Sequence, residues 1–185
     1  MEKLITQFGC QSLTPTHINR IISFGLNCPS SSNLDSLYNS GMIVSHRDLD
    51  ILLDSYENGD RFYIYTGRGP SSGSLHIGHL IPFLTAKYLQ DIFDAPVFIQ
   101  LSTDEKYLRD NLSLEEVEAM ARSNAHDIMS LQFNPDKTLI ISNFSAIEQL
   151  YPTTMNILRH ITVKQMTSTF GINDGDKLGN YYFPA

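Results

Sequence analysis

The chain of 185 residues carries 13 Lys and Arg against 20 Asp and Glu, a formal net charge of -7 at pH 7. Its 42% hydrophobic and 18% charged residues are an ordinary globular composition, which excludes a disordered or fibrous chain. The acidic balance argues against a surface that coats polyanions, although a local basic patch on an acidic protein can still contact RNA.

The chain start and the cysteines bear on the cellular compartment. The segment MEKLITQFGCQSL lacks a long apolar stretch behind a basic start, and nowhere do 18 apolar residues follow one another. The sequence therefore predicts neither a signal peptide nor a membrane span. With no sign of secretion, Cys10 and Cys28 are expected to be reduced, which favours a cytoplasmic protein.

The first predicted element is a short helix that Thr14 caps, with Pro15 at its first position and a glycine to close it. Residues 26–44 contain a proline and many serines and asparagines, so they are predicted to form a loop with little regular structure. We expect this loop to separate an N-terminal appendage of residues 1–44 from a main domain of residues 45–185.

Ser45 caps the second predicted helix, over residues 46–59, and Asp48 occupies its capping-box position. Leucines and a tyrosine recur along it at helical spacing, which predicts an amphipathic helix. From Arg61 onward the pattern alternates between strands and helices. Strands are predicted over residues 62–66, 96–101 and 138–142. One helix is predicted over residues 75–93, and another begins at a capping box at residues 113–116. Residues 145–170 are predicted to be helical in two pieces.

This alternation determines the predicted fold class. Strands joined by helical crossovers imply a parallel sheet with right-handed connections, which is half of a doubly wound nucleotide-binding fold. Ligands of such sheets bind beyond the carboxyl ends of the strands, where the loop after the first strand is expected to lie. The residues that carry the chemistry are therefore expected in that loop.

The loop suits a phosphate group. A helix beginning just after Gly73 would direct free backbone N–H groups and its positive dipole end at the space beyond the strand. Gly67, Gly69 and Gly73 allow the backbone to approach a ligand closely, and Arg68 supplies a fixed cation. The segment lacks the third glycine of the dinucleotide-binding pattern G-x-G-x-x-G.

Two histidines follow this loop at a spacing of three residues. His76 and His79 would share one face of the first helical turns, where they could donate hydrogen bonds to a phosphate that gains charge in a transition state. Gly78 between them would let a flat ring rest on the backbone. The alternative is that both histidines are ordinary surface residues. Metal ligation requires a third His, Cys or acid at ligand spacing, and none stands there, so no metal site is predicted.

These residues carry a family resemblance. His76-Ile77-Gly78-His79 matches the HIGH signature of class I aminoacyl-tRNA synthetases, and the wider block YTGRGPSSGSLHIGHL resembles tryptophanyl-tRNA synthetases of the eukaryotic and archaeal type. Residues 45–48 (SHRD) and 99–108 (IQLSTDEKYL) resemble further segments of that group. The resemblance covers residues 45–185 well and the first 44 more loosely. It implies an α/β fold, the Rossmann-like half of a class I synthetase catalytic domain, with a short helical N-terminal appendage.

The resemblance also implies residue roles. Tyr65 and Gln100 would lie beside the indole of tryptophan, which agrees with the chemistry, because an indole N–H only donates and needs an acceptor. Glu105 would face the ammonium group. The alternatives are an ordinary strand aromatic for Tyr65 and plain polar residues for Gln100 and Glu105. The ATP site would comprise Arg68, Gly69, His76, Gly78, His79 and Lys106, of which His76, His79 and Lys106 would be catalytic.

The implied activity is that of a tryptophan–tRNA ligase. Tryptophan attacks the α-phosphate of ATP, with Mg²⁺ bridging phosphate oxygens, and the acyl group then passes from the adenylate to tRNA(Trp). The expected partners are L-tryptophan, tRNA(Trp) and, in the full-length family, a second copy in a homodimer. The location would be cytoplasmic, without membrane contact.

Part of the family's apparatus is not recognisable in the sequence. The lysine-rich KMSKS loop, a second set of strands and an anticodon-binding domain are expected beyond Ala185, and residues 164–168 (KQMTS) lack the second lysine. The end at YYFPA indicates a truncated N-terminal half, whose exposed sheet edge would reduce stability. The alternatives are an inactive fragment or binding module that retains ATP, tryptophan or dimer contacts, and, more remotely, a tyrosyl-tRNA synthetase.

Overall fold

The computed structural model describes residues 10–73, 75–172 and 175–179, so the YYFPA end lies outside the described residues. The chain divides into two compact units, which are described one at a time. The first unit comprises residues 1–66, 76–98 and 130–139, and the second comprises residues 67–75, 99–129 and 140–185. This division does not coincide with the predicted boundary after residue 44. Across the described parts of the chain, no helix is both long and apolar enough to cross a membrane.

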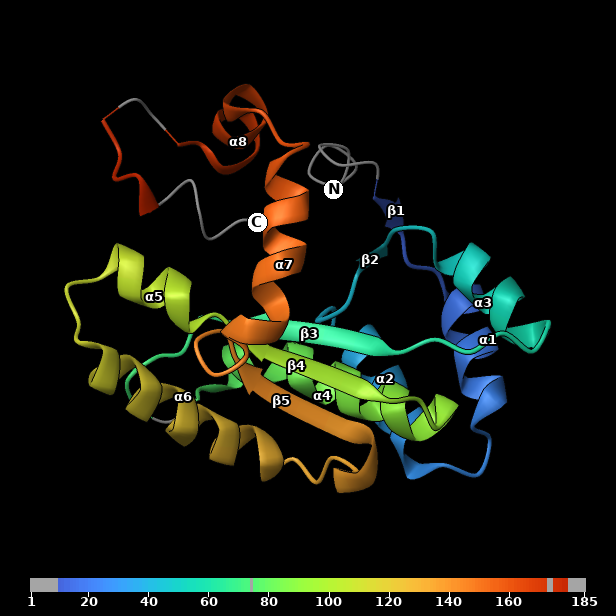
Figure 1. Ribbon diagram of the computed structural model, residues 1–185. Helices are drawn as coiled ribbons and strands as arrows, with labels where there is room; N and C mark the ends of the chain where they lie inside the picture. The colour runs from blue at the N-terminus through green and yellow to red at the C-terminus, as the bar shows by residue number, and fades with distance from the viewer. Residues whose placement is uncertain (1–9, 74, 173–174, 180–185) are drawn as a thin grey trace. The chain divides into compact units, whose positions relative to one another are not determined.

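Three strands form the main sheet, in the order β3-β4-β5 (Figure 1). They are β3 (Ile64–Arg68), β4 (Val97–Leu101) and β5 (Thr138–Ser142). The backbone N–H of Ile64 donates to the carbonyl of Pro96 at 2.8 Å, and that of Ser102 donates to the carbonyl of Arg68 at 3.0 Å. Because the pairing advances in the same direction along β3 and β4, the two strands are parallel. The predicted parallel sheet is therefore confirmed.

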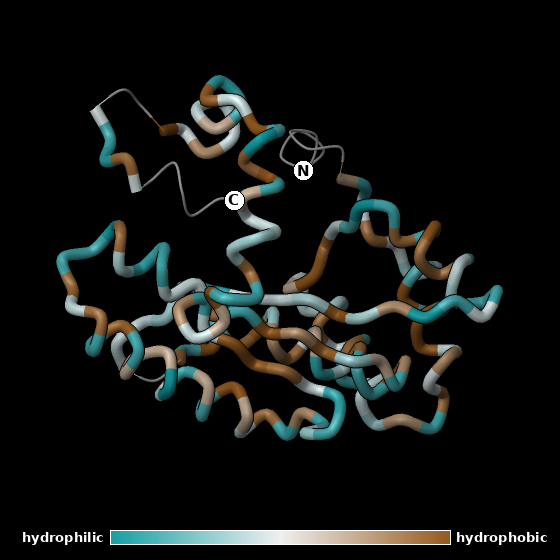
Figure 2. The backbone as a smooth tube through the Cα atoms, viewed as in Figure 1, coloured by the Kyte–Doolittle hydropathy of each residue, from teal (hydrophilic) through white to brown (hydrophobic). Residues whose placement is uncertain are grey.

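The strand ends differ slightly from the prediction. β5 occupies the predicted residues, whereas β3 begins at Ile64 and ends at Arg68, two residues later than predicted. Gly67 and Arg68 therefore belong to a strand rather than to a loop. Apolar residues gather along β4 and β5 (Figure 2). Alternate residues of β4 are buried, at 2% exposure or less.

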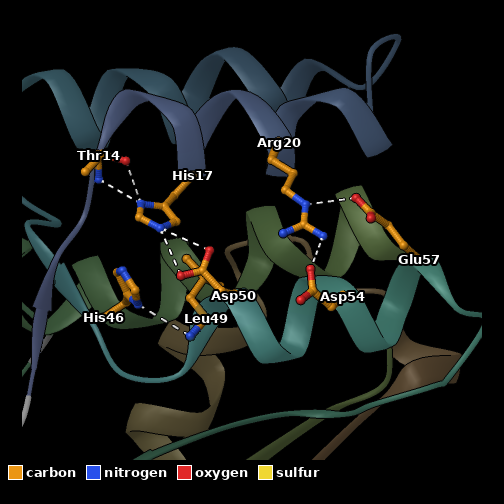
Figure 3. Close-up of polar contacts among 8 residues, drawn as sticks. All are labelled: Thr14, His17, Arg20, His46, Leu49, Asp50, Asp54 and Glu57. Atoms are coloured by element: carbon orange, nitrogen blue, oxygen red, sulfur yellow. Dashed lines mark hydrogen bonds and ion pairs between the residues drawn. The ribbon is translucent and has the colours of Figure 1, made fainter.

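In the first unit, α1 (Pro15–Phe24) begins after Thr14 as predicted. The side chain of Arg20 joins it to α3 (Leu49–Glu57) by an ion pair with Asp54 at 2.6 Å and another with Glu57 at 2.8 Å (Figure 3). The core beneath contains rings in edge and tilted contact with centroids 4.8 to 5.7 Å apart, and its ring members are Phe24, Tyr56, Phe62 and Phe93.

The start of the second predicted helix was wrong. Ser45 and His46 form β2, which pairs antiparallel with β1 (Gln11–Ser12). Asp48 is the N-cap of α3 and adopts a left-handed conformation at φ 54°. Residues 46–48 are therefore not helical, because backbone pairing with β1 extends the chain immediately before the helix.

The predicted loop over residues 26–44 was also wrong, because α2 (Pro29–Asn39) occupies most of it. α2 packs on α1 and α4, with Leu34 only 1% exposed. Buried Ser30 donates to Asp91 at 2.6 Å, and the hydroxyl of Ser36 donates to the carbonyl of Ser32 at 2.9 Å. Tertiary packing, together with the bond from Ser30 to Asp91, outweighs the low helix propensity of serine.

The long helix α4 (Ile77–Phe93) contains Pro82 and begins two residues later than predicted. In the second unit, α5 (Thr103–Arg109) follows β4 and packs on α6 (Leu114–Met129). The predicted capping box of α6 is confirmed by reciprocal bonds between Ser113 and Glu116 of 2.7 and 3.2 Å. The predicted helical pieces are also confirmed, as α7 (Ile147–Leu158) and α8 (Val163–Phe170), and residues 164–168 lie within α8.

Candidate functional site

The loop that follows β3 is fixed by two polar residues of α6. The side-chain oxygen of Asn124 accepts from the N–H of Ser71 at 2.9 Å, and its amide nitrogen donates to the carbonyl of Ser71 at 3.1 Å. Asp127 accepts from the N–H of Leu75 at 3.1 Å. Asn124 is fully buried, between the buried Ala121 and Ile128 of the same helix. An asparagine on this apolar face was the available signal, and the sequence reasoning missed it.

The three glycines of this segment have different roles. A Cβ on Gly67 would lie 2.5 Å from the carbonyl oxygen of Gln100, so a side chain there collides with β4 rather than with a ligand. Gly73 adopts φ 75°, a conformation that favours glycine. Gly69 has room for a Cβ, since its nearest neighbours would be Ser102 at 3.7 Å and Glu105 at 3.9 Å.

Arg68 is held by its own loop. Its Nε donates to the carbonyl of Gly69 at 3.0 Å, and its Nη2 donates to the hydroxyl of Ser71 at 3.1 Å. Burial lowers the pKa of the Arg68 guanidinium, which still remains charged at neutral pH. Arg68 is thus a fixed cation beside the half-buried backbone of Gly69.

In the first unit, His76 and His79 lie together at the start of α4. His76 is the N-cap, and its carbonyl accepts from the N–H of His79 at 2.8 Å. The two rings have centroids 3.5 Å apart and an interplanar angle of 30°. A Cβ on Gly78 would lie 3.2 Å from the His76 ring, so glycine leaves room for it. The predicted shared face is confirmed, whereas the predicted helix start after Gly73 was wrong.

Tyr65 lies on β3 in the same unit. Its ring stacks on Phe98 with centroids 6.0 Å apart, and it lines an open groove of about 590 Å³. Although 58% of Tyr65 is exposed, burial of the remainder raises the pKa of its phenol, and Tyr63 adds to the shift. The phenol therefore stays protonated at neutral pH, able to donate or accept a hydrogen bond.

The polar residues after β4 belong to the second unit. Gln100 donates from Nε2 to Oδ1 of Asn143 at 2.6 Å. Glu105 accepts from the hydroxyl of Ser102 at 3.1 Å and pairs with Arg109 at 2.8 Å.

The basic residue of this segment is also paired. Lys106 pairs with Asp110 at 2.5 Å, and this hydrogen bond lowers the pKa of the Asp110 carboxyl below its usual range. Both Glu105 and Lys106 therefore already have partners that a substrate would have to displace or share.

One group in the described part of the chain could supply three metal ligands, namely His17, His46 and Asp50 (Figure 3). Nδ1 of His17 accepts from the N–H of Thr14 at 3.1 Å, so the neutral ring carries its proton on Nε2, which lies 3.2 Å from Asp50. His46 likewise accepts at Nδ1 from a backbone N–H, that of Leu49 at 3.4 Å. Ligand nitrogens must be unprotonated, so these bonds favour a structural role for the group.

No family model matches the chain. Among curated proteins, the cytoplasmic tryptophan–tRNA ligase of Schizosaccharomyces pombe is 42% identical over 186 residues, which cover 100% of this chain and 46% of that protein. Among solved structures, the tryptophanyl-tRNA synthetase of Plasmodium falciparum has a TM-score of 0.89 and 44% identity over 99% of this chain and 49% of its own. That of Encephalitozoon cuniculi, bound to tryptophan, has a TM-score of 0.90 and 36% identity over 99% and 49%.

These similarities establish the fold class. The predicted α/β fold, a parallel sheet with helical crossovers, is the fold that these solved tryptophanyl-tRNA synthetases have over about half of their length. The match to the curated ligase covers 100% of the chain and therefore includes the first 44 residues. The chain spans slightly less than half the length of the relatives that it matches.

Proposed function

This chain is homologous along its whole length to the tryptophan–tRNA ligases, and from that premise we propose that it binds tryptophan and ATP for the formation of tryptophanyl-adenylate. The observation that carries the proposal is this whole-length similarity, 42% identical to a curated ligase. A tRNA(Trp) acceptor and a cytoplasmic location belong to the same proposal, since the curated relative is a cytoplasmic tryptophan–tRNA ligase. A homodimer is proposed only on the family resemblance.

For the amino acid, we assign Tyr65 and Gln100 to the indole and Glu105 to the ammonium group. The protonated phenol of Tyr65 and the amide of Gln100 both offer oxygen acceptors to a ring N–H. Glu105 is partly buried and already accepts a hydrogen bond from the hydroxyl of Ser102, so its carboxylate is oriented within the second unit. An ammonium group would compete with the exposed Arg109 for this carboxylate.

For ATP, we assign the phosphates to Arg68, Gly69 and Lys106 and to the start of α4 at His76, Gly78 and His79. Imidazole N–H groups and the N-terminal end of a helix both stabilise negative charge. Fixed donors of this kind contribute most where charge develops on the α-phosphate. Mg²⁺ bound with ATP would neutralise part of the charge on the phosphates.

A second candidate function is a binding module without catalysis. It is favoured by the pairing of Glu105 with Arg109 and of Lys106 with Asp110, because these ion pairs occupy two of the proposed ligand groups. Such a protein would retain affinity for tryptophan or ATP and would not form the adenylate.

We expect the purified 185-residue chain to exchange labelled pyrophosphate into ATP when tryptophan is present, because exchange requires only the first reaction step. The measurement is the exchange rate with tryptophan, with tyrosine and with no amino acid. A folded chain that binds tryptophan or ATP by calorimetry without exchange would be a binding module. Absence of both binding and exchange would contradict the proposed function.

Replacing Asp110 with asparagine should strengthen ATP binding by a few-fold. Asp110 pairs with Lys106, and its lowered pKa keeps it ionised as pH falls until the pH passes that lowered value. The carboxylate of Asp110 therefore competes with phosphate for Lys106 at neutral pH. Because exposed ion pairs of this kind are weak, the gain in affinity should be only a few-fold. The measurement is the ATP dissociation constant at pH 7, with Asp110→Glu as the control that keeps the charge. Equal affinities in wild type and Asp110→Asn would argue against Lys106 as a phosphate ligand.

A further inference from the structure

Three polar side chains in the second unit form a continuous hydrogen-bonded chain. The carboxylate of Asp104, on α5, accepts from Nδ2 of Asn143 at 2.7 Å. Oδ1 of Asn143 in turn accepts from Nε2 of Gln100, at the end of β4, at 2.6 Å. Asn143 is only 8% exposed, and its backbone N–H donates to the carbonyl of Leu101 at 3.1 Å. Both ends of the Asn143 amide are therefore fixed.

The carboxylate determines the direction of every bond in this chain. An ionised carboxylate only accepts, so Asn143 must turn its NH₂ group towards Asp104. The same Asp104 oxygen accepts from the backbone N–H of Glu105 at 2.8 Å, which holds it in place. The carbonyl oxygen of Asn143 then faces Gln100, and Gln100 must offer its own NH₂ group in return. The carbonyl oxygen of Gln100 is thereby directed away from Asn143.

We propose that Asn143 and Asp104 are positioning residues that make Gln100 present a hydrogen-bond acceptor, and so select an aromatic amino acid with a ring N–H. This inference rests on the proposed tryptophan site. A glutamine amide alone is ambivalent, because a rotation of its terminal torsion exchanges donor and acceptor. Neither residue was singled out for a role by the sequence reasoning. Asn143 follows the last residue of β5, where no motif marks it.

The direction of the chain can be tested without any ligand. We expect the side-chain NH₂ protons of Gln100, observed by NMR in the free protein, to exchange with water more slowly than those of exposed glutamines. The Asn143→Leu variant should lose this protection, because leucine removes the acceptor. The Asn143→Asp variant should keep it, because the new carboxyl group shares one proton with Asp104 and its second oxygen still accepts from Gln100. Unprotected Gln100 protons in the wild type would overturn the inference.

The selective role is tested with two ligands, tryptophan and 3-(3-benzothienyl)alanine, in which sulfur replaces the ring N–H. We expect wild type and Asn143→Asp to prefer tryptophan by about tenfold, the ratio that one hydrogen bond contributes. Asn143→Leu should lower this preference to about twofold, whatever the change in its stability. A preference that Asn143→Leu retains would refute the positioning role while the tryptophan site stands.

The two proposals fail in different ways. Wild-type protein that binds neither amino acid contradicts the tryptophan site and the selective role together. If the Gln100 NH₂ protons of that protein still exchange slowly, the direction of the hydrogen bonds from Gln100 to Asn143 and from Asn143 to Asp104 stands, and the selective role does not. Should Asn143→Leu fail to fold, the wild-type exchange rate and the preference of Asn143→Asp remain, and a loss of preference in Asn143→Asp contradicts the inference.

Discussion

The Gly67→Ala variant is expected to lose about 3 kcal/mol or more of its free energy of unfolding. A Cβ at this position would lie 2.5 Å from the carbonyl oxygen of Gln100, closer than van der Waals contact allows. The Cβ has a fixed position on the backbone of residue 67, and the oxygen belongs to the backbone of Gln100. No side-chain rotation can therefore relieve the overlap. Relief requires β3 and β4 to separate, which lengthens the parallel hydrogen bonds at this end of the pair.

The measurement is chemical denaturation of the variant beside wild type. Gly69→Ala is the matched control, because the nearest atoms to its Cβ would be 3.7 Å away and its φ lies outside the left-handed region. We expect that control to change stability by less than about 1 kcal/mol. Marginal domains have only about 5 to 15 kcal/mol of stability in total, so Gly67→Ala should also express poorly. Equal stabilities of the two variants would show that β3 has more room than the distance indicates.

Helices with local end signals could be predicted from the sequence. Thr14 and Pro15 mark the start of α1, and Ser113 with Glu116 marks that of α6, since each signal acts through hydrogen bonds within one turn. The start of α3 could not be predicted in this way. Its preceding residues pair with β1, more than thirty residues earlier in the chain, and this contact is not local.

The helix α2 shows the limit of composition. Its serines favoured the prediction of a loop, because serine hydroxyls form hydrogen bonds with nearby backbone groups in non-helical conformations. In the folded chain, Ser31 donates to the carbonyl of Gly25 at 2.7 Å and Leu34 is buried, so packing on α1 and α4 decides the conformation. A single sequence does not contain that information.

The candidate site likewise contains residues that could be predicted from local spacing and residues that could not. The paired histidines could be predicted as neighbours, because a spacing of three residues suffices to bring them onto one face of a helix. The partners of the loop could not, since Asn124 lies 53 residues from Ser71. The same applies to Asn143, which lies 43 residues from Gln100. Motif spacing thus identifies residues near the chemistry, whereas the residues that orient them emerge only from the fold.

The largest expected effect on activity belongs to His79. Given exchange by the wild-type chain, His79→Ala should lower its turnover by about 10² to 10³-fold and change the KM for ATP little. The ring of His79 lies in the first turn of α4, half-buried against His76, and a donor held in this way needs no reorientation when charge develops. An interaction made mainly in the transition state affects turnover rather than binding.

The measurement is tryptophan-dependent pyrophosphate exchange over a range of ATP concentrations, which separates turnover from KM. His160→Ala is the control, because His160 is exposed beyond the end of α7 and has no proposed role. We expect that control to match wild type in both constants. A rise in KM with unchanged turnover in His79→Ala would make His79 a ground-state ligand of ATP, and an unaltered rate would remove it from the site.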